Sequence, residues 1–306
     1  MNSFYFLFAA TFVVHVFCVC LMSFKITLLP VSNLLQSKGN LLDLTRPLVM
    51  GIINITPDSF FADSRRQNTA EILQQAERMI SEGASILDIG GASTRPGAGE
   101  VSELEELERV LPAIEAIHRQ FPEIWISVDT YRSKVAKNAV EAGSSIINDI
   151  SGGLFDENML STVAALKVPY IAMHLKGTIQ TMHKNPEYKN VTLEVLQDLG
   201  NIVDSCNKVG IFDVILDPGF GFAKNISHNF ELLNNMAQLH QLGKPILAGV
   251  SRKSMIYKTL NTDAANALNG TTALNMIALQ QGANILRVHD VKEAWETIQL
   301  FEMLGK

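Results

Sequence analysis

The sequence predicts a single (β/α)8 barrel with an apolar N-terminal extension, and three observations support this fold. Short runs rich in Val and Ile alternate with longer amphipathic stretches from about residue 46 onward. Such alternation is typical of parallel βαβ units. Eight units occupy residues 47–306, which is the number and size expected of this barrel. An open doubly wound sheet is the alternative, but its G-x-G-x-x-G fingerprint after the first strand is absent.

The predicted strands are short apolar runs, at residues 48–54, 85–90, 125–130, 145–150, 169–174, 214–219, 245–250 and 285–290. Between them, apolar residues recur at spacings of three and four, which indicates amphipathic helices. Several of these stretches end at a glycine, the residue that most often ends a helix. These glycines are Gly83, Gly143, Gly210, Gly243 and Gly282.

Upstream of the barrel lie an apolar leader, residues 1–24, and a lead-in, residues 25–46. No Asp, Glu, Lys or Arg occurs between Phe4 and Phe24, and a run of this length could span a membrane. A cleaved signal is a second interpretation, although no basic residue precedes the run and no A-x-A site follows it. A third is that translation starts at Met22, so that a membrane is relevant only if the leader is made. We expect the barrel to need nothing upstream of its first strand.

Composition limits the class of protein. The chain has 306 residues, of which 47% are hydrophobic and 18% charged, enough for a large core. Its net charge of −6 argues against general nucleic-acid binding. The three cysteines, Cys18, Cys20 and Cys206, have neither zinc-site spacing nor the pattern of a disulfide framework. A reducing, cytoplasmic location is therefore expected.

Polar residues gather at the C-terminal ends of the predicted strands, where barrel enzymes have their active sites. A single polar residue there could be a helix cap, but burying this many without a ligand or partner would be costly. They are Asn54, Asp88, Asp129, Asn148, Asp149, His174, Asp217, Ser251, Arg252, Lys253, Arg287, His289 and Asp290.

Two kinds of ligand chemistry are indicated. Asp129, Asn148 and Asp217 offer acceptors and one amide, which suits a heterocycle with several N–H donors. Arg287 is well suited to phosphate or pyrophosphate; with His289 and Asn54 it comes from the first and last strands, which are neighbours in a closed barrel. A metal ion could accompany such an anion. Lys253 starts a helix, where a cation opposes the helix dipole, so we expect a ligand to need it.

Segments spanning about 250 residues in order resemble the dihydropteroate synthase family, a branch of the pterin-binding family. They are MGIINITPDSF (50–60), DIGGASTRPGA (88–98), SVDT (127–130), INDISGG (147–153), MH (173–174), TMHKNPEY (181–188), DPGFGFAK (217–224), GVSRKS (249–254) and RVHDV (287–291). The wider family includes methyltetrahydrofolate-dependent methyltransferases. The STRPGA and SRKS segments are more particular to the synthases.

The resemblance implies a folate-biosynthesis transferase that joins 6-hydroxymethyl-7,8-dihydropterin pyrophosphate to p-aminobenzoate, releasing pyrophosphate, with Mg²⁺. It also implies a homodimer and a sulfonamide target. The alternatives are a pterin-binding methyltransferase module and a non-catalytic pterin-binding paralogue.

The resemblance also assigns residues to each part of the reaction. The pterin is held by polar and apolar side chains of the barrel mouth, namely Asp129, Asn148, Met173, Asp217, Phe222 and Lys253. Asn54 is expected to bind both the Mg²⁺ and the pyrophosphate. Arg287 and His289 are expected to bind the pyrophosphate as well. With Lys253, these three form the expected catalytic set. The p-aminobenzoate is expected to bind at Thr94, Arg95, Pro96 and Ser254.

The chain departs from the family pattern in its long connections, at residues 56–68, 92–100 and 175–190. Ala92 occupies a position where the family usually has a glutamate, and Lys176 one where a glutamine is common. The family also has an Asp-Gly-Gly run near residues 62–64. This chain lacks that run, and its aspartate, Asp63, lies one position later. These changes affect the connections rather than the pterin pocket. We assign no general base, because an aromatic amine is already neutral at pH 7.

Overall fold

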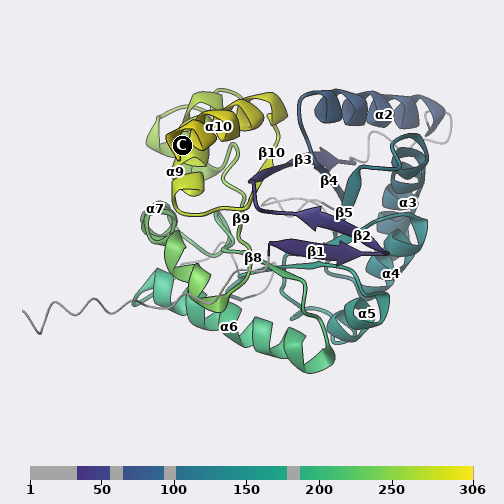
Figure 1. Ribbon diagram of the computed structural model, residues 1–306, viewed down its shortest axis with the longest axis horizontal. Coiled ribbons are helices and arrows are strands. Elements are labelled where there is room, and N and C mark those ends of the chain that lie inside the picture. The colour runs from purple at the N-terminus through teal and green to yellow at the C-terminus, as the bar shows by residue number, and fades with distance from the viewer. Residues whose placement is uncertain (1–32, 56–64, 93–100, 178–186, 306) are drawn as a thin grey trace, which may run out of the picture.

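The computed structural model describes residues 33–55, 65–92, 101–177 and 187–305, and these form a parallel eight-stranded barrel surrounded by helices (Figure 1). The strands follow the order β8-β7-β6-β5-β4-β3-β10-β9. A parallel bridge between Leu216 and Ile246 joins the two ends of this order. There the Leu216 N–H donates to the Pro245 carbonyl at 2.8 Å. The predicted fold class is confirmed.

Each barrel strand lies within a predicted run. The strands are β3 (Leu48–Asn54), β4 (Ile86–Gly90), β5 (Trp125–Asp129), β6 (Ile146–Asp149), β7 (Tyr170–Met173), β8 (Val214–Asp217), β9 (Leu247–Ala248) and β10 (Ile285–Val288). The largest difference is β9, which keeps two of the six predicted residues. Pro245 has no N–H with which to extend the ladder, and β9 pairs with β10 only at Leu247 and Ala248.

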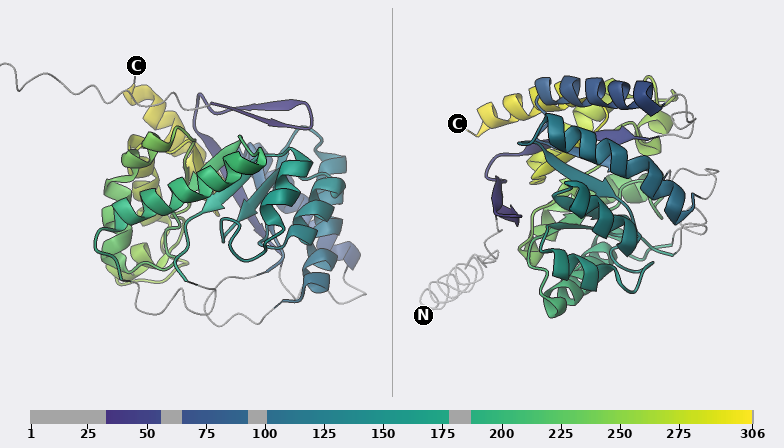
Figure 2. Two further views of the ribbon diagram at one scale, coloured as in Figure 1. Left: turned by 90° about the horizontal axis from the view of Figure 1, so that it is seen from below. Right: turned by 90° about the vertical axis from the view of Figure 1, so that its right-hand side faces the viewer.

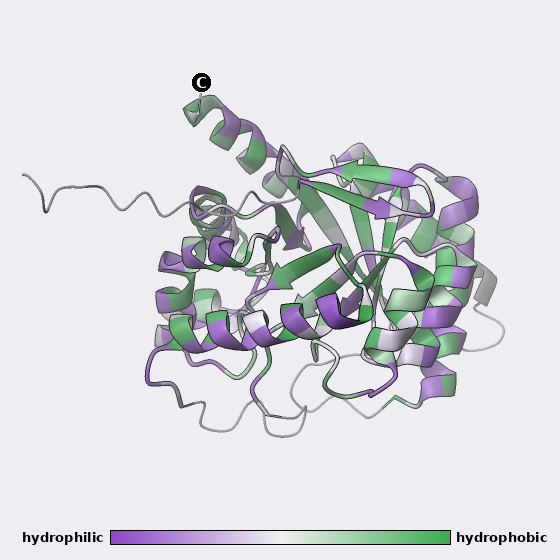
Figure 3. Cartoon of the chain, turned by 60° about the horizontal axis from the view of Figure 1, so that its bottom comes forward, coloured by the Kyte–Doolittle hydropathy of each residue, from purple (hydrophilic) through white to green (hydrophobic). Residues whose placement is uncertain are grey.

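Helices cover the outside of the strands in the order expected of βα units. They are α2 (Arg65–Ser81), α3 (Glu103–Gln120), α4 (Ser133–Ala142), α5 (Met159–Leu166), α6 (Val191–Val209), α7 (Ile226–Asn234), α8 (Ser254–Thr259), α9 (Leu268–Gln280) and α10 (Val291–Leu304), with a 3₁₀ helix, η2 (Met236–Leu242). Asn190 caps α6 by accepting from the Leu193 N–H, and Gly210 ends it with φ +90°. Figure 3 shows largely hydrophobic strands inside helices of mixed hydropathy. The main core therefore lies between the two layers.

An antiparallel hairpin, β1 (Leu34–Ser37) and β2 (Asn40–Asp43), closes the N-terminal end of the barrel. It crosses the centre of the view in Figure 1 and lies over one end of the strands in Figure 2. The apolar residues Leu35 and Leu42 of the hairpin, and Leu44 just after it, are buried in one cluster. The rest of this cluster comes from the starts of the barrel strands, namely Met50, Ile86, Trp125, Ile146, Ile171, Ile215, Leu247 and Ile285. The barrel therefore packs against a segment upstream of its first strand, which the sequence pattern did not indicate.

Within the part of the chain that the structure describes, no helix is both long and apolar enough to cross a membrane. The leader, residues 1–24, and residues 25–32 lie outside that part. All three interpretations of the leader therefore remain as the sequence left them.

Candidate active site

The ends of neighbouring strands bring several predicted polar residues into one row. In register, Asn54 of β3 pairs with Gly90 of β4, Gly90 with Asp129 of β5, and Asp129 with Asn148 of β6. Gly90 leaves an opening in this row. A Cβ there would lie 3.6 Å from Asn54 Oδ1 and 3.7 Å from Asp129 Cβ. The side chains of Asn54 and Asp129 therefore flank the same space at the barrel mouth.

Arg287 holds two carboxylates at the floor of this mouth. Its Nε donates to Asp88 Oδ2 at 2.6 Å, and its Nη2 donates to Asp129 Oδ2 at 2.7 Å. Asn148 Nδ2 donates to the same oxygen of Asp88 at 3.1 Å. The Asp88 side chain is fully buried, whereas those of Arg287 and Asp129 are 19% and 27% exposed. Asp88 therefore anchors the arginine from below, and Arg287 and Asp129 face the opening.

The charges of this cluster are strongly perturbed. Burial raises the pKa of Asp129 to about 7, and the neighbouring Arg287 only partly offsets this. Burial opposes the charge of Arg287, but Asp88 and Asp129 outweigh it and raise the Arg287 pKa. Arg287 is thus a fixed cation, whereas Asp129 can exchange a proton near neutral pH.

Lys253 reaches back into the barrel mouth from the start of α8. It occupies the N-cap position of that helix, and its Nζ donates to the Phe220 carbonyl. The same Nζ lies 4.7 Å from the centre of the Phe222 ring. Burial lowers the pKa of Lys253 to about 8, against the attraction of Asp217. The expectation that this lysine serves the mouth rather than its own helix agrees with this position.

Asp217, at the end of β8, is buried and accepts the Gly219 N–H at 2.7 Å. Burial raises its pKa, and Lys253 opposes that rise. Beside it, β7 and β8 pair Met173 with Asp217. Met173 belongs to an apolar cluster at this end of the barrel, against which Phe222 packs. The two predicted apolar walls therefore stand together next to Asp217.

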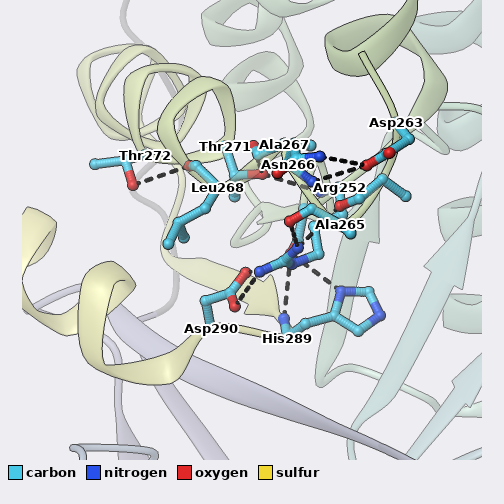
Figure 4. Close-up of polar contacts among 12 residues, drawn as sticks. Arg252, Asp263, Ala265, Asn266, Ala267, Leu268, Thr271, Thr272, His289 and Asp290 are labelled. Atoms are coloured by element: carbon cyan, nitrogen blue, oxygen red, sulfur yellow. Dashed lines mark hydrogen bonds and ion pairs between the residues drawn. The ribbon is translucent and has the colours of Figure 1, made fainter.

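A second polar group joins the turn after β9 to the end of β10 (Figure 4). Arg252 Nε and Nη2 donate to the two oxygens of Asp290, each at 2.8 Å. Arg252 Nη1 also donates to the carbonyls of Ala264 and Ala265. The Arg252 backbone has φ +54°, a costly conformation for a residue with a side chain. These contacts hold the turn that presents Lys253.

His289 and Ser254 lie beside this turn. Ser251 Oγ lies 3.1 Å from His289 Nδ1 and accepts the His289 N–H at 3.2 Å. His289 is thereby fixed beside the turn after β9. Ser254 is the first residue of α8, where backbone N–H groups favour an anion.

Part of the predicted site cannot be placed. Thr94, Arg95 and Pro96, and also Asp63, lie outside the described residues. Most of the connection at residues 56–68 lies outside as well, and α2 begins at Arg65, before the predicted end of that connection.

Lys176, in the third connection, is described. Its Nζ donates to the Glu187 carbonyl at 2.8 Å and to Glu194 Oε2 at 2.9 Å. It also lies 4.4 Å from the centre of the Tyr188 ring. This lysine therefore ties the two described ends of the connection together.

Two residues of the mouth were absent from the predicted site. Asp88 is one of the polar residues at the strand ends, but the predicted site does not include it, although it anchors Arg287. Lys224 closes the DPGFGFAK segment, and only 8% of it is exposed. The sequence signal for Lys224 is its position at the end of a glycine-rich turn that follows a strand.

The fold and the mouth together define a barrel enzyme whose pocket suits a polar heterocycle and an anion. Comparison with known proteins narrows this class. Residues 50–289 match the pterin binding enzyme family. The dihydropteroate synthase of Escherichia coli is 44% identical over 270 residues, which cover 88% of this chain and 95% of that protein.

Solved structures agree with this match. Dihydropteroate synthase from Yersinia pestis, in a sulfonamide drug complex, superposes with a TM-score of 0.83 at 42% identity and covers 89% of this chain and 99% of its own. The Xanthomonas albilineans enzyme, in complex with 7,8-dihydropteroate, has a TM-score of 0.79 at 34% identity, with coverage of 90% and 99%. The chain belongs to the pterin-binding enzyme family, within the group of dihydropteroate synthases.

Proposed function

We propose that the chain catalyses the condensation of 6-hydroxymethyl-7,8-dihydropterin pyrophosphate with p-aminobenzoate, giving dihydropteroate and pyrophosphate. The observation that supports this most directly is the joint presence of a heterocycle pocket and an anion-binding arginine in one barrel mouth. The Xanthomonas relative was solved with 7,8-dihydropteroate, in which the pterin and the p-aminobenzoate parts are joined. The reaction belongs to folate biosynthesis and makes the protein a transferase.

The pterin binds between the polar row and the apolar wall. Asp217 and Asn148 hydrogen-bond to the ring edge, and Asp129 and Lys253 hold its other polar atoms. Met173 and Phe222 cover its faces. A fixed pocket of this kind places the methylene carbon for attack by the amine.

Catalysis rests on stabilising the leaving group and on orientation. Arg287 keeps further N–H donors beyond those used by its two carboxylates, and these face the pyrophosphate together with His289. The aromatic amine attacks as the neutral base, so the chain supplies no general base. The amine proton leaves to solvent after the C–N bond forms.

Mg²⁺ fits this mouth as a companion of the pyrophosphate. No group of three or more His, Cys, Asp or Glu in the described part of the chain could hold a metal ion. Asn54 Oδ1 and Asp129 nevertheless flank the opening at Gly90. Mg²⁺ commonly binds through one or two protein oxygens and completes its shell with phosphate and water. Asn54 is the residue that would hold it, and the ion would neutralise charge on the leaving group.

We place the protein in the cytoplasm as a homodimer that sulfonamides inhibit. The Yersinia relative was solved with a sulfonamide drug. The absence of a zinc-spaced or disulfide-forming set of cysteines fits a reducing compartment.

The test of the proposed function is a dihydropteroate assay with the purified protein. We expect pyrophosphate release that requires both substrates, with dihydropteroate as product. A methyltransferase module would instead transfer a methyl group from a folate and release no pyrophosphate. A non-catalytic paralogue would bind the pterin without turnover, and either result would overturn the proposal.

Asp217→Asn provides the matching test of the pterin pocket. An amide offers one acceptor and places donors against the N–H edge of the ring, a buried mismatch costing about 1–3 kcal/mol. We expect pterin affinity to fall by about 5- to 150-fold in calorimetry. An unchanged affinity would remove Asp217 from the pterin site.

A further inference from the structure

Lys224 occupies the inside of the turn that follows β8. Its Nζ donates to the carbonyls of Gly219 at 3.0 Å and Phe222 at 3.2 Å. The same Nζ lies 3.0 Å from His174 Nδ1, at the end of β7. One side-chain nitrogen therefore joins two points of the turn to the neighbouring strand. Asp217 begins this turn and Phe222 lies within it, and both belong to the proposed pterin pocket.

The contact with His174 requires one tautomer of that ring. His174 Nδ1 can accept from Lys224 only when it carries no proton. The other nitrogen, Nε2, lies 3.1 Å from Asp198 Oδ2 on α6. A carboxylate accepts but does not donate, so Asp198 places the proton on Nε2 and leaves Nδ1 as the acceptor. Burial lowers the pKa of His174 to about 4, so the ring is neutral at pH 7.

The turn contains residues in the left-handed region, and one of them, Ala223, carries a side chain. Gly219 has φ +70°, and a Cβ there would lie 2.2 Å from the His174 carbonyl oxygen. Ala223, directly before Lys224, has φ +47°. Residues with side chains keep this conformation only where the surroundings hold them in it. The contact between Lys224 Nζ and the Phe222 carbonyl joins the two residues on either side of Ala223.

We propose that Lys224, His174 and Asp198 form a positioning relay that holds the turn after β8 in the shape that binds the pterin. The inference rests on the proposed function and adds to it three residues that do not touch the substrate. Asp198 orients His174, His174 accepts from Lys224, and Lys224 holds the turn that carries Asp217 and Phe222. The outer end of the relay is on the surface, because the Asp198 side chain is 51% exposed.

The position of Asp198 makes the relay testable apart from stability. Replacing an exposed carboxylate costs little folding free energy, yet the relay predicts an effect on pterin binding. Asp198→Ala removes the acceptor for Nε2, and Asp198→Asn keeps an oxygen that can still accept. Asp204→Ala is the matched control, because Asp204 is an exposed aspartate on the same helix.

The experiment measures kcat, KM for each substrate, and the melting temperature of the full chain. For Asp198→Ala we expect KM for the pterin pyrophosphate to rise about five- to tenfold, the size of the net contribution of one hydrogen bond. KM for p-aminobenzoate at saturating pterin, and kcat, should stay near the wild-type values. The melting temperature should fall by no more than about 2 °C. Asp198→Asn should recover most of the pterin affinity, and Asp204→Ala should match the wild type.

A double-mutant cycle completes the test. His174→Asn places an amide oxygen near the Nδ1 position, where it accepts from Lys224 without needing a tautomer. In this background, Asp198→Ala should have no further effect on pterin KM, because coupled residues are non-additive. An active wild type in which Asp198→Ala equals Asp204→Ala, or in which its effect persists beside His174→Asn, would overturn the relay. A wild type without dihydropteroate synthesis would overturn the proposed function instead.

Discussion

Asp88 shows how a single carboxylate can organise a binding site without facing the ligand. It is fully buried and accepts from both Arg287 and Asn148 through one oxygen. Two residues of the proposed pocket are thus oriented by one residue beneath them. A buried charge of this kind is stable only while its partners remain in place.

Asp88→Asn should therefore destabilise the protein as well as the site. The substitution leaves Arg287 with one carboxylate and places an amide donor against it or against Asn148. Losing one partner of a buried ion pair costs about 3–5 kcal/mol, and the free energy of unfolding from urea denaturation should fall by this amount. Glu302→Gln, which weakens the surface pair with Arg46, should change it far less because solvent screens that pair. Equal effects would show that Asp88 is not an anchor.

Lys224 should give stability a distinct dependence on pH. Burial lowers its pKa from 10.5 to about 7, although Asp217 opposes the shift. Between these values the unfolded chain holds a proton that the folded chain has lost, so unfolding takes up a proton. The contribution of Lys224 to the free energy of unfolding is therefore fully present above pH 10.5. It is lost as the pH falls, and is gone below about pH 7.

The measurement is urea denaturation of the wild type and Lys224→Met from pH 6.5 to pH 9. Subtracting the variant removes the contributions of other groups. The difference in free energy of unfolding, wild type minus variant, should increase with pH across this window. A difference that stays flat would mean that Lys224 keeps its proton in the folded state.

At the scale of elements, the hairpin β1–β2 was the part of the fold that the sequence pattern did not indicate. Neither strand alternates apolar and polar side chains, because β1 reads LLQS and β2 reads NLLD. Its buried side chains find their partners only at the first residues of the barrel strands. The hairpin is therefore stabilised by packing against the closed end of the barrel rather than by a pattern in its own sequence.

Leu35→Ala tests how much the hairpin contributes. Leu35 is 1% exposed within the cluster that closes the barrel, and removing a buried leucine side chain costs about 2–5 kcal/mol. Leu41→Ala in the facing strand is the control, because Leu41 is 64% exposed, and its effect should stay within about 0.5 kcal/mol. The urea denaturation midpoints of the two variants measure this difference in stability. Similar small effects of both substitutions would show that the barrel does not depend on the hairpin.

For the whole molecule, the described residues contain the complete ring of strands and the hairpin that closes one end. The active mouth lies at the other end, formed by the C-terminal ends of the strands. Closure matters here, because it makes the first strand and the last strand neighbours. Arg287 of β10 reaches Asp88 of β4 and Asp129 of β5 across the inside of that ring.

A chain that starts at Met22 should be fully active, because it keeps the hairpin and every strand. A chain that starts at Arg46 lacks the hairpin and should be less stable or insoluble, since the apolar end of the barrel would face water. Activity assays and denaturation of both proteins provide the comparison. If residues 1–21 alone restored activity to an inactive Met22 protein, the leader would be part of the enzyme.

Much of this architecture could be predicted from the sequence because its cause is local. Buried parallel strands are continuous apolar runs, as at residues 48–54, and the helices between them carry a regular apolar face. Polar residues that end such runs indicate a site, because a barrel collects strand ends on one face. Asp217 and Arg287 could be recognised in this way before any contact was known.

Contacts between distant segments depend on tertiary structure, and they decided the rest. The pairing of Arg287 with Asp88 joins residues 199 positions apart, and Lys224 meets His174 across 50 positions. No local pattern distinguishes a lysine that enters the solvent from one that fills the inside of a turn. The sequence by itself determined the barrel and the set of polar residues at its mouth, since hydrophobic periodicity records burial. Which of them anchor, which face the ligand and which support a turn depends on the closed barrel, because only its curvature sets the distances among them.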